Sequence, residues 1–419
     1  MIRILKSSDT AAIDALVRHD AARDPRVVRT ARRIVDAIRA GGDEALIAYA
    51  RKLDALRQPL EITPDEILEG AARVPRDVRR AIATAVRHVE RVSARQVPKP
   101  FTMSPTAGVV IEQRVTPLAR VGCYVPAGRY PLPSSLVMSA VPARMAGVGE
   151  VIAVCPRPDD TVLAAALEAG VTRMFRVGGA QAIAALAYGT ATIPAVDRIV
   201  GPGNAYVAAA KALVAADCPI DFNAGPSEIA IVSDEGDPNW IAADLVAQAE
   251  HDPEARAILI TTSRALAVRV TRAIEACLRS ERQAGSPARA SLAAHGAIVI
   301  ARTRIDAVGI LNRIAPEHAV CDDEDTARLI TTAGTIFVGA WSAQAAGDYA
   351  TGSNHILPTG GAARFRGGLG AADFVKITSV QRISRDGLRR IGPAAIALAD
   401  AEGLAGHADS IRLRIEGRR

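Results

Sequence analysis

The 419-residue sequence is poor in aromatic residues and has no hydrophobic run long enough to span a membrane. Phe, Tyr and Trp make up only 3% of the chain, which provides no platform for stacking nucleic-acid bases. The net charge is +6, but the basic residues are interspersed with acidic ones. No run reaches the roughly 18–20 apolar residues of a transmembrane helix, and the N-terminal residues lack the features of a signal peptide. We therefore expect a cytoplasmic protein that binds neither nucleic acid nor membranes.

Cysteines are also few, and they are scattered along the chain. The odd number of cysteines and the absence of any Cys-x-x-Cys pair argue against a disulfide framework. We expect them to behave as small buried hydrophobic side chains. The five cysteines are Cys123, Cys155, Cys218, Cys277 and Cys321.

The pattern of apolar residues predicts an α/β protein. Hydrophobic residues make up 49% of the chain, enough for two or three domains. Residues 1 to about 100 show helical periodicity. From residue 109, short β-rich segments alternate with Ala-rich helical segments, which is typical of parallel sheets with helices on both faces. The expected strands are GVVIEQRV, GEVIAVCP, TRMFRVGG, DRIVGPG, EIAIVSD, RAILITT, GAIVIA and GTIFVGA. Because eight strands are many for one sheet, we expect two α/β domains.

Two further segments stand out near the C-terminus. The Gly-rich stretch from Gly347 to Gly370 is long for a loop between two secondary-structure elements. Loops of this length more often contribute to function than merely connect elements. After Lys376 the chain is expected to return to helix. This tail is too short to form a domain, so it must pack on another surface.

The segment DLVAQAEH carries three polar residues on an otherwise apolar helix, predicted over 238–251 between two Asp-Pro pairs. Asp244, Gln248 and His251 follow i, i+4, i+7 spacing and therefore project from one side. A buried Gln needs a partner, and His251 could share one, such as a metal ion. A hydrogen-bonded Gln beside a surface His explains the same pattern.

Two other segments supply candidate acid, base and metal-binding groups. APEHAV places Glu317 before His318, a pair suited to proton transfer near neutral pH. Adjacent residues cannot share a helix face, so a joint role requires a loop or a helix start, which Pro316 favours. GDYATGSNH adds the carboxylate of Asp348 and the imidazole of His355.

The segment DRIVGPGNAYVAAAKALVAA predicts a strand, a Gly-Pro-Gly turn and a helix that opens at Asn204. The N-terminus of such a helix offers free N–H groups and a positive dipole end to a nucleotide phosphate. A Gly-x-Gly-x-x-Gly fingerprint after a strand is absent from the sequence.

Taken in order, eight segments of the chain resemble the histidinol dehydrogenase family. They are CYVPAGRYPLPSSLVMSAVPARMAGV, VGGAQAIAALAYGT, VGPGNAYVAAAK, NAGPSEIAIVSD, DLVAQAEH, APEHAV, GDYATGSNHILPT and HADSIRLRI. The resemblance implies a zinc-dependent oxidation of L-histidinol to L-histidine through L-histidinaldehyde with two NAD, the last step of histidine biosynthesis.

The resemblance also implies roles for individual residues. Glu317 and His318 would be the catalytic acid–base pair, and Asp244 would orient His251. The implied zinc ligands are Gln248, His251, Asp348 and His407. The implied NAD contacts are Tyr124, Gln181 and Asn204. The implied substrate contacts are Ser227, Gln248, His251, His318, Asp348, His355, Glu402 and His407.

The family fold implied by the resemblance has two Rossmann-like parallel-sheet domains, with extended helical terminal segments that intertwine in a homodimer. Glu402 and His407 would then be contributed across the interface. The expected divisions are an N-terminal arm over 1–20, a first Rossmann-like domain over 21–122 and 229–370, a second, NAD-binding one over 123–228, and a C-terminal dimerisation tail over 371–419.

Other functions fit some of the same residues. A dehydrogenase of this fold could oxidise another alcohol, such as a sulfonated diol, although Glu402 near His407 would repel a sulfonate. A metallohydrolase could use Glu317 as the base for metal-bound water. A non-catalytic metal-binding protein would leave Glu317 and His318 unexplained. Formation of NADH upon addition of histidinol distinguishes the proposed activity from the last two.

Overall fold

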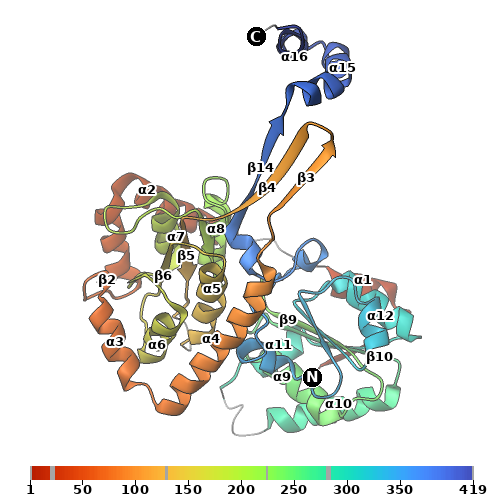
Figure 1. Cartoon of the computed structure of the whole chain (residues 1–419). Coiled ribbons are helices and arrows are strands. Elements are labelled where there is room, and N and C mark those ends of the chain that lie inside the picture. Colours follow the sequence, from red (N-terminus) through yellow and green to blue (C-terminus); the bar gives the residue numbers. More distant parts are fainter. Residues whose placement is uncertain (1, 19–23, 128–130, 223–224, 280–284, 418–419) are drawn as a thin grey trace.

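The computed structural model describes residues 2–18, 24–127, 131–222, 225–279 and 285–417. Two α/β lobes lie side by side, and a ribbon of long strands rises from between them and carries the C-terminal helices at its tip (Figure 1). Among these residues, no helix is both long and apolar enough to cross a membrane.

The first lobe is built on a five-stranded sheet. Strands β5 to β8 run parallel, and the short β2 pairs antiparallel with β7. In order across the sheet, the strands are β2 (Glu61–Ile62), β7 (Arg173–Phe175), β6 (Glu150–Val154), β5 (Arg120–Tyr124) and β8 (Arg198–Val200).

Helices cover both faces of this sheet, which explains why the residues of β5 to β8 are apolar and buried after the first, charged residue of each strand. Successive side chains of β7 point to opposite faces of the sheet. Met174 and Phe175 are therefore both fully buried, but they belong to separate hydrophobic clusters. One cluster includes α3 (Pro64–Arg73), α4 (Arg76–Gln96), α5 (Pro133–Met145) and α6 (Asp160–Ala169). The other includes α2 (Pro25–Leu53), α7 (Gly179–Tyr188) and α8 (Ala205–Val214).

The second lobe has a six-stranded parallel sheet. Its strand order is β1 (Arg3–Lys6), β11 (Ala297–Ile300), β10 (Arg256–Thr261), β9 (Glu228–Val232), β12 (His318–Cys321) and β13 (Thr335–Val338). One face packs on α9 (Pro238–Ala249), α10 (Arg264–Leu278) and α11 (Ala288–Ala294). The other packs on α1 (Thr10–Val17) and α12 (Arg304–Ile314). The remaining elements of this part of the chain are α13 (Glu324–Leu329), α14 (Gln344–Tyr349) and the 3₁₀ turns η2 (Ala362–Arg364) and η3 (Ala371–Phe374).

A three-stranded antiparallel sheet forms the projecting ribbon, which we call the arm together with the helices at its tip. The order is β14 (Val375–Ile383), β4 (Val109–Pro117) and β3 (Phe101–Thr106). All nine residues of β14 pair with β4. The arm ends in α15 (Arg385–Ala401) and α16 (Ala405–Glu416), far from both lobes in Figure 1.

The structure confirms the α/β class and two sheets that are parallel apart from the edge strand β2. It also confirms that all five cysteines are free, and all but Cys277 are buried. Two local expectations were wrong. GVVIEQRV lies in the antiparallel arm rather than a parallel sheet, and the chain after Lys376 first forms β14. The alternating polar residues of β14 gave no core pattern because both faces of the ribbon are largely exposed.

The grouping of segments into domains also differs from the expectation. Residues 25–96 pack on the five-stranded sheet with 120–214. Of the segment 229–370, Ile356 and Leu369 join the same cluster, whereas its strands form the other sheet. Residues 3–6 form an edge strand of the six-stranded sheet instead of a free arm, because Arg3 to Lys6 pair with β11. The boundary expected at residues 20–21 lies outside the described residues. The periodicity of a helix shows that it has an apolar face, but not which sheet covers that face.

A buried ion pair holds the turn between β8 and α8. Lys211 Nζ contacts Asp221 Oδ1 and donates to the Gly201 carbonyl at 2.9 Å. Asp221 Oδ2 in turn accepts from Gly201 N at 2.8 Å. Gly201 has φ +112°, and a Cβ there would lie 2.2 Å from the Tyr124 carbonyl oxygen. The ion pair and the glycine together fix the turn that precedes Asn204.

We predict that Lys211→Met lowers the free energy of unfolding by about 3–5 kcal/mol, because it leaves the Asp221 carboxylate buried and unpaired. Urea denaturation measures the loss. The exposed pair Arg39–Asp217, at 3.9 Å, provides the control, and Arg39→Ala should cost at most about 1 kcal/mol. Similar losses in both variants would show that the buried pair does not stabilise the turn.

Candidate active site

Most of the predicted catalytic residues meet at the amino ends of β9 and β12. Ser227 directly precedes β9, and Glu317 directly precedes β12, which begins at His318. These strands are parallel neighbours with His318 opposite Ile229, so residues at their starts share one edge of the sheet. A joint role of Glu317 and His318 was expected to require a loop or a helix start. The structure places Glu317 in the loop before β12 and His318 at the first residue of this strand.

Hydrogen bonds join three of these segments into one chain. The Ser227 hydroxyl donates to Glu317 Oε2 at 2.5 Å. The same oxygen accepts from the Glu228 amide at 3.0 Å. Gln248, near the end of α9, donates from Nε2 to Ser227 Oγ. Gln248 is fully buried, and its Oε1 has no hydrogen-bond partner among the described residues.

His318 is buried between two carboxylates. Its Nδ1 lies 3.7 Å from Glu317 Oε2, and its Nε2 lies 3.8 Å from Asp348 Oδ1. Nδ1 also lies 3.1 Å from the Glu228 carbonyl oxygen. A carbonyl only accepts, so Nδ1 carries the proton and Nε2 is the basic nitrogen of the neutral ring.

The pKa values of Glu317 and His318 are both raised. Burial disfavours the imidazolium, but the Glu317 and Asp348 carboxylates outweigh burial and raise the pKa of His318. Burial raises the pKa of Glu317 despite the opposing effects of His318 and Ser227. Each group is therefore a stronger base than it would be in water.

Asp348 and His355 enter the cluster from α14 and the loop that follows it. Gln344 Nε2 donates to Asp348 Oδ2 at 3.0 Å, and His355 Nδ1 lies 2.8 Å from the Asp348 carbonyl oxygen. His355 Nε2 is 3.5 Å from Ser135 Oγ of the other lobe. Burial raises the pKa of Asp348, but His318, His355 and His251 together lower it below the usual value. Burial lowers the pKa of His355.

His251 follows the end of α9 and is exposed. Its Nδ1 lies 3.0 Å from the Ala247 carbonyl oxygen and 3.2 Å from that of Gln248. These contacts orient the ring, so the predicted role of Asp244 in orienting His251 was wrong. Asp244 instead lines a cavity at the opposite edge of the sheet. The helix predicted to 251 ends at Ala249.

Glu402 and His407 lie apart from the other predicted site residues of the same chain. Glu402 caps the end of α15, and His407 lies in the first turn of α16. Both are exposed at the tip of the arm (Figure 1). Within the described residues of this single chain, no group of three or more His, Cys, Asp or Glu side chains is placed to hold a metal ion.

The residues predicted to contact NAD line a cavity of about 520 Å³ in the other lobe. Tyr124 ends β5, Gln181 lies in the first turn of α7, and Asn204 caps α8 with its side chain. The cavity therefore opens at the carboxyl ends of the strands. Strand order reverses there, since β5 lies between β6 and β8, and such switch points bind ligands in open α/β sheets.

Sequence reasoning missed several neighbours of both sites. Asp54, at the end of α2, accepts from Gln181 Nε2 at 2.9 Å and from Gly178 N at 3.0 Å, and no sequence pattern marked it. Gln344 could have been found, because it precedes Asp348 by one helical turn. Ser135 could not, since only the packing of the two lobes brings it to His355.

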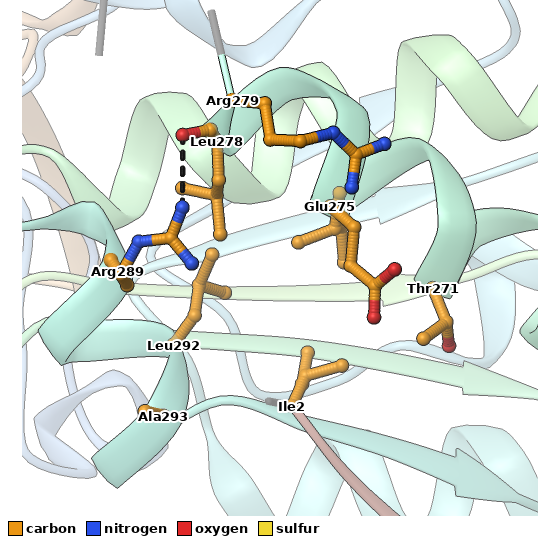
Figure 2. Close-up of a pocket in the computed structure, with 9 residues that line it drawn as sticks. Ile2, Thr271, Glu275, Leu278, Arg279, Arg289, Leu292 and Ala293 are labelled. Atoms are coloured by element: carbon orange, nitrogen blue, oxygen red, sulfur yellow. Dashed lines mark hydrogen bonds between the residues drawn. The ribbon is translucent and has the colours of Figure 1, made fainter. Parts of the chain in front are cut away.

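A third cavity, of about 330 Å³, lies between α10, α11 and the start of β1 (Figure 2). Arg289 donates to the Leu278 carbonyl at 3.1 Å across its rim. Apolar side chains, including Ile2 and Leu292, form much of the rest of its lining. None of the residues predicted for catalysis, metal binding or NAD binding lines it.

Two largely parallel sheets, a cavity at a switch point and a buried acid–imidazole cluster are typical of a two-lobe α/β enzyme such as a nucleotide-dependent oxidoreductase. A sequence profile of the histidinol dehydrogenase family matches residues 17–415. The chain belongs to this family, whose enzymes catalyse the last step of histidine biosynthesis.

Individual relatives agree with this assignment over at least nine-tenths of their lengths. Histidinol dehydrogenase from Geobacter metallireducens is 46% identical over 396 residues, covering 92% of this chain and 91% of the relative. The Syntrophotalea carbinolica enzyme is 44% identical and covers 99% of this chain and 100% of the relative. The crystal structure of histidinol dehydrogenase from Elizabethkingia anophelis superposes with a TM-score of 0.93 at 30% identity, covering 99% of this chain and 98% of that chain.

We predict that Ser227→Ala lowers the free energy of unfolding by about 1–3 kcal/mol, because the buried Gln248 amide loses its acceptor. Ser139 provides a matched control. It is fully buried and its hydroxyl donates only to the Ser135 carbonyl of the same helix, at 2.8 Å. Ser139→Ala should therefore cost about 1 kcal/mol or less. Urea denaturation compares the two, and an equal loss would argue against the hydrogen-bonded chain.

Proposed function

We propose that this protein oxidises L-histidinol to L-histidine through L-histidinaldehyde, with two NAD and one zinc ion per subunit, in the cytoplasm. The observation that carries the proposal is the buried chain from Glu317 through Ser227 to Gln248, which leaves the Gln248 amide oxygen without a partner among the described residues. An orphaned buried oxygen is costly unless a ligand satisfies it.

The residues of the cluster fit a zinc ion. Gln248 Oε1, an Asp348 carboxylate oxygen and the Nε2 of His251 are nitrogen and oxygen donors of the kind that zinc accepts. His251 Nδ1 contacts backbone carbonyls, which leaves Nε2 to bind a metal. A histidine that binds a metal usually donates its other ring N–H to such a carbonyl. We propose His407 as the fourth ligand. When bound, zinc would hold the amine and imidazole of the substrate.

The protein's own groups then perform the proton transfers. In the alcohol step, His318 Nε2 accepts the hydroxyl proton, and the nearby Glu317 carboxylate stabilises the imidazolium. In the aldehyde step, Glu317 accepts a proton from the attacking water, for which its raised pKa suits it. Ser227, His355 and Glu402 would contact the substrate. NAD, when bound, supplies the electron acceptor for both steps.

The cavity of about 520 Å³ at the switch point supports NAD binding. Tyr124, Gln181 and Asn204 line it, and Gln181 Oε1 has no hydrogen-bond partner among the described residues. The Asn204 side chain accepts from the Tyr206 and Val207 amides, so the amino end of α8 would attract a phosphate mainly through the positive end of its dipole. Burial raises the pKa of Tyr124 to about 12, so this hydroxyl stays protonated.

We further propose that the enzyme is a homodimer with composite active sites. The arm carries His407 and Glu402 away from the lobes of their own chain, and it exposes large apolar side chains. Leu413 is 71% exposed, Leu398 65% and Ile377 56%. Apolar surface of this extent on an extended arm is typical of an interface with another molecule, and two-fold symmetry would supply each arm to the other subunit.

We predict that the purified enzyme contains about one zinc per chain and that a chelator abolishes activity, with partial rescue by cobalt or manganese. Gln248→Ala should reduce the zinc content. Gln181→Ala, which removes another buried amide, should retain zinc but raise the KM for NAD. Metal analysis with steady-state kinetics measures both, and full activity of metal-free enzyme would refute the zinc assignment.

A second prediction separates the two oxidation steps. Glu317→Gln should still oxidise histidinol to the aldehyde but should turn over supplied histidinaldehyde poorly, because only that step needs activated water. His318→Gln should impair the alcohol step most. Single-turnover formation of NADH from each substrate gives the rates. Equal losses in both steps for both variants would contradict the separate roles.

A third prediction tests the composite site. Gln248→Ala and His407→Ala chains, each inactive alone, should regain activity when they are unfolded and refolded together. About half of the dimers would be hybrids with one intact site of two, so recovery should approach roughly a quarter of wild-type activity. If mass spectrometry finds hybrid dimers without any recovered activity, His407 serves its own chain.

A further inference from the structure

The second lobe contains a cavity at the edge of its sheet opposite to the catalytic cluster. The cavity has a volume of about 230 Å³ and lies at the carboxyl ends of β9, β12 and β13. Strand order reverses at this point, because β9 lies between β10 and β12. The cavity therefore lies at the switch point of the six-stranded sheet, just as the proposed NAD cavity lies at the switch point of the five-stranded sheet.

The lining of the cavity is acidic and lacks basic residues. Glu235, Asp237, Asp244 and Asp322 contribute carboxylates, and no Lys, Arg or His is among the described lining residues. Two of these four carboxylates already accept hydrogen bonds from backbone amides. Asp237 accepts from the first amides of α9, and Asp322 accepts from the Asp234 and Glu235 amides.

Asp244 is different, because its carboxylate is only partly exposed and has no partner among the described residues. It projects from α9 one turn after Trp240. Burial raises the pKa of Asp244 to about 6, and no neighbouring charge or hydrogen bond offsets it. A carboxylate withdrawn from water without compensation is unfavourable, and a cation in the cavity would supply that compensation.

The only two tryptophans of the chain lie at this cavity. Trp240 lines it, and Trp341 packs beside Trp240 with ring centroids 5.3 Å apart. Trp341 is 89% exposed and Trp240 47%, so both offer ring surface to a ligand. Tryptophan is the side chain that binds organic cations best through its ring face.

We propose that this cavity binds a small organic cation, in which an ammonium or quaternary ammonium group contacts Asp244 and the Trp240 and Trp341 rings. A simple metal ion would not use the aromatic pair, and an anion would be repelled by four carboxylates. The site is separate from the substrate site, because Gln248 and Ser227 lie at the other edge of the same sheet.

Tryptophan fluorescence tests the proposal directly, because both fluorophores lie at the site. Choline is the probe, and its uncharged carbon analogue 3,3-dimethyl-1-butanol is the matched control. Choline should change the emission of the full-length enzyme saturably, and the alcohol should not. Asp244→Asn, which preserves shape but removes the charge, should weaken choline binding about tenfold or more.

Two further variants complete the test. Trp341→Phe keeps an aromatic ring, so it should weaken binding less than Trp341→Ala, with calorimetry as the readout. Gln248→Ala, which disrupts the catalytic cluster, should leave the choline response intact. The proposal is overturned if wild-type enzyme gives no saturable response, if the alcohol binds equally well, if Asp244→Asn binds like wild type, or if Gln248→Ala abolishes the response.

Discussion

The carboxylate of Glu317 is the group on which the arrangement of the catalytic cluster depends. Its Oε2 accepts the proton of the Ser227 hydroxyl. Since that proton is engaged, Ser227 can only accept from the Gln248 amide nitrogen. The side-chain amide of Gln248 is thus held in one orientation, with its oxygen left over. One buried charge therefore fixes the direction of every bond in the chain and determines which atom is presented to a ligand.

The same carboxylate links the cluster to acid–base chemistry. It lies beside His318 and raises the pKa of the imidazole. Burial raises the pKa of Glu317 itself, although His318 acts in the opposite direction. The backbone contributes as well, because the Glu228 amide donates to Glu317 while the Glu228 carbonyl faces His318. A single residue at the start of β9 therefore positions both partners. Because Glu317 precedes β12 and only His318 belongs to the strand, the alternation of side chains along a strand does not keep these two neighbours apart.

The sequence predicted those parts of the structure that depend on local patterns. Apolar strands, the Asn204 cap and the helix around Gln248 follow from spacing and capping residues. The role assigned to Asp244 was wrong because helical spacing locates a residue on a face but does not show what lies opposite. Ser135 near His355 depends on the packing of two lobes. The β14 strand was missed because an exposed ribbon needs no core residues, and its stability comes from backbone pairing with β4.

The arm is the part of the structure that contacts within one chain explain least. Gly108 and Gly387 pack so closely that a Cβ on Gly387 would lie 2.2 Å from the Gly108 carbonyl oxygen, and the Ser384 amide donates to that carbonyl at 2.8 Å. These contacts fix α15 to the end of the ribbon, so α15 cannot fold back on its own lobes without breaking them. The His407 imidazole and the Glu402 carboxylate are therefore held exposed at the tip of the arm, apart from the catalytic cluster of their own chain. The proposed exchange between subunits therefore rests on the contacts that hold α15 at the end of the ribbon as much as on the exposed apolar residues of the arm.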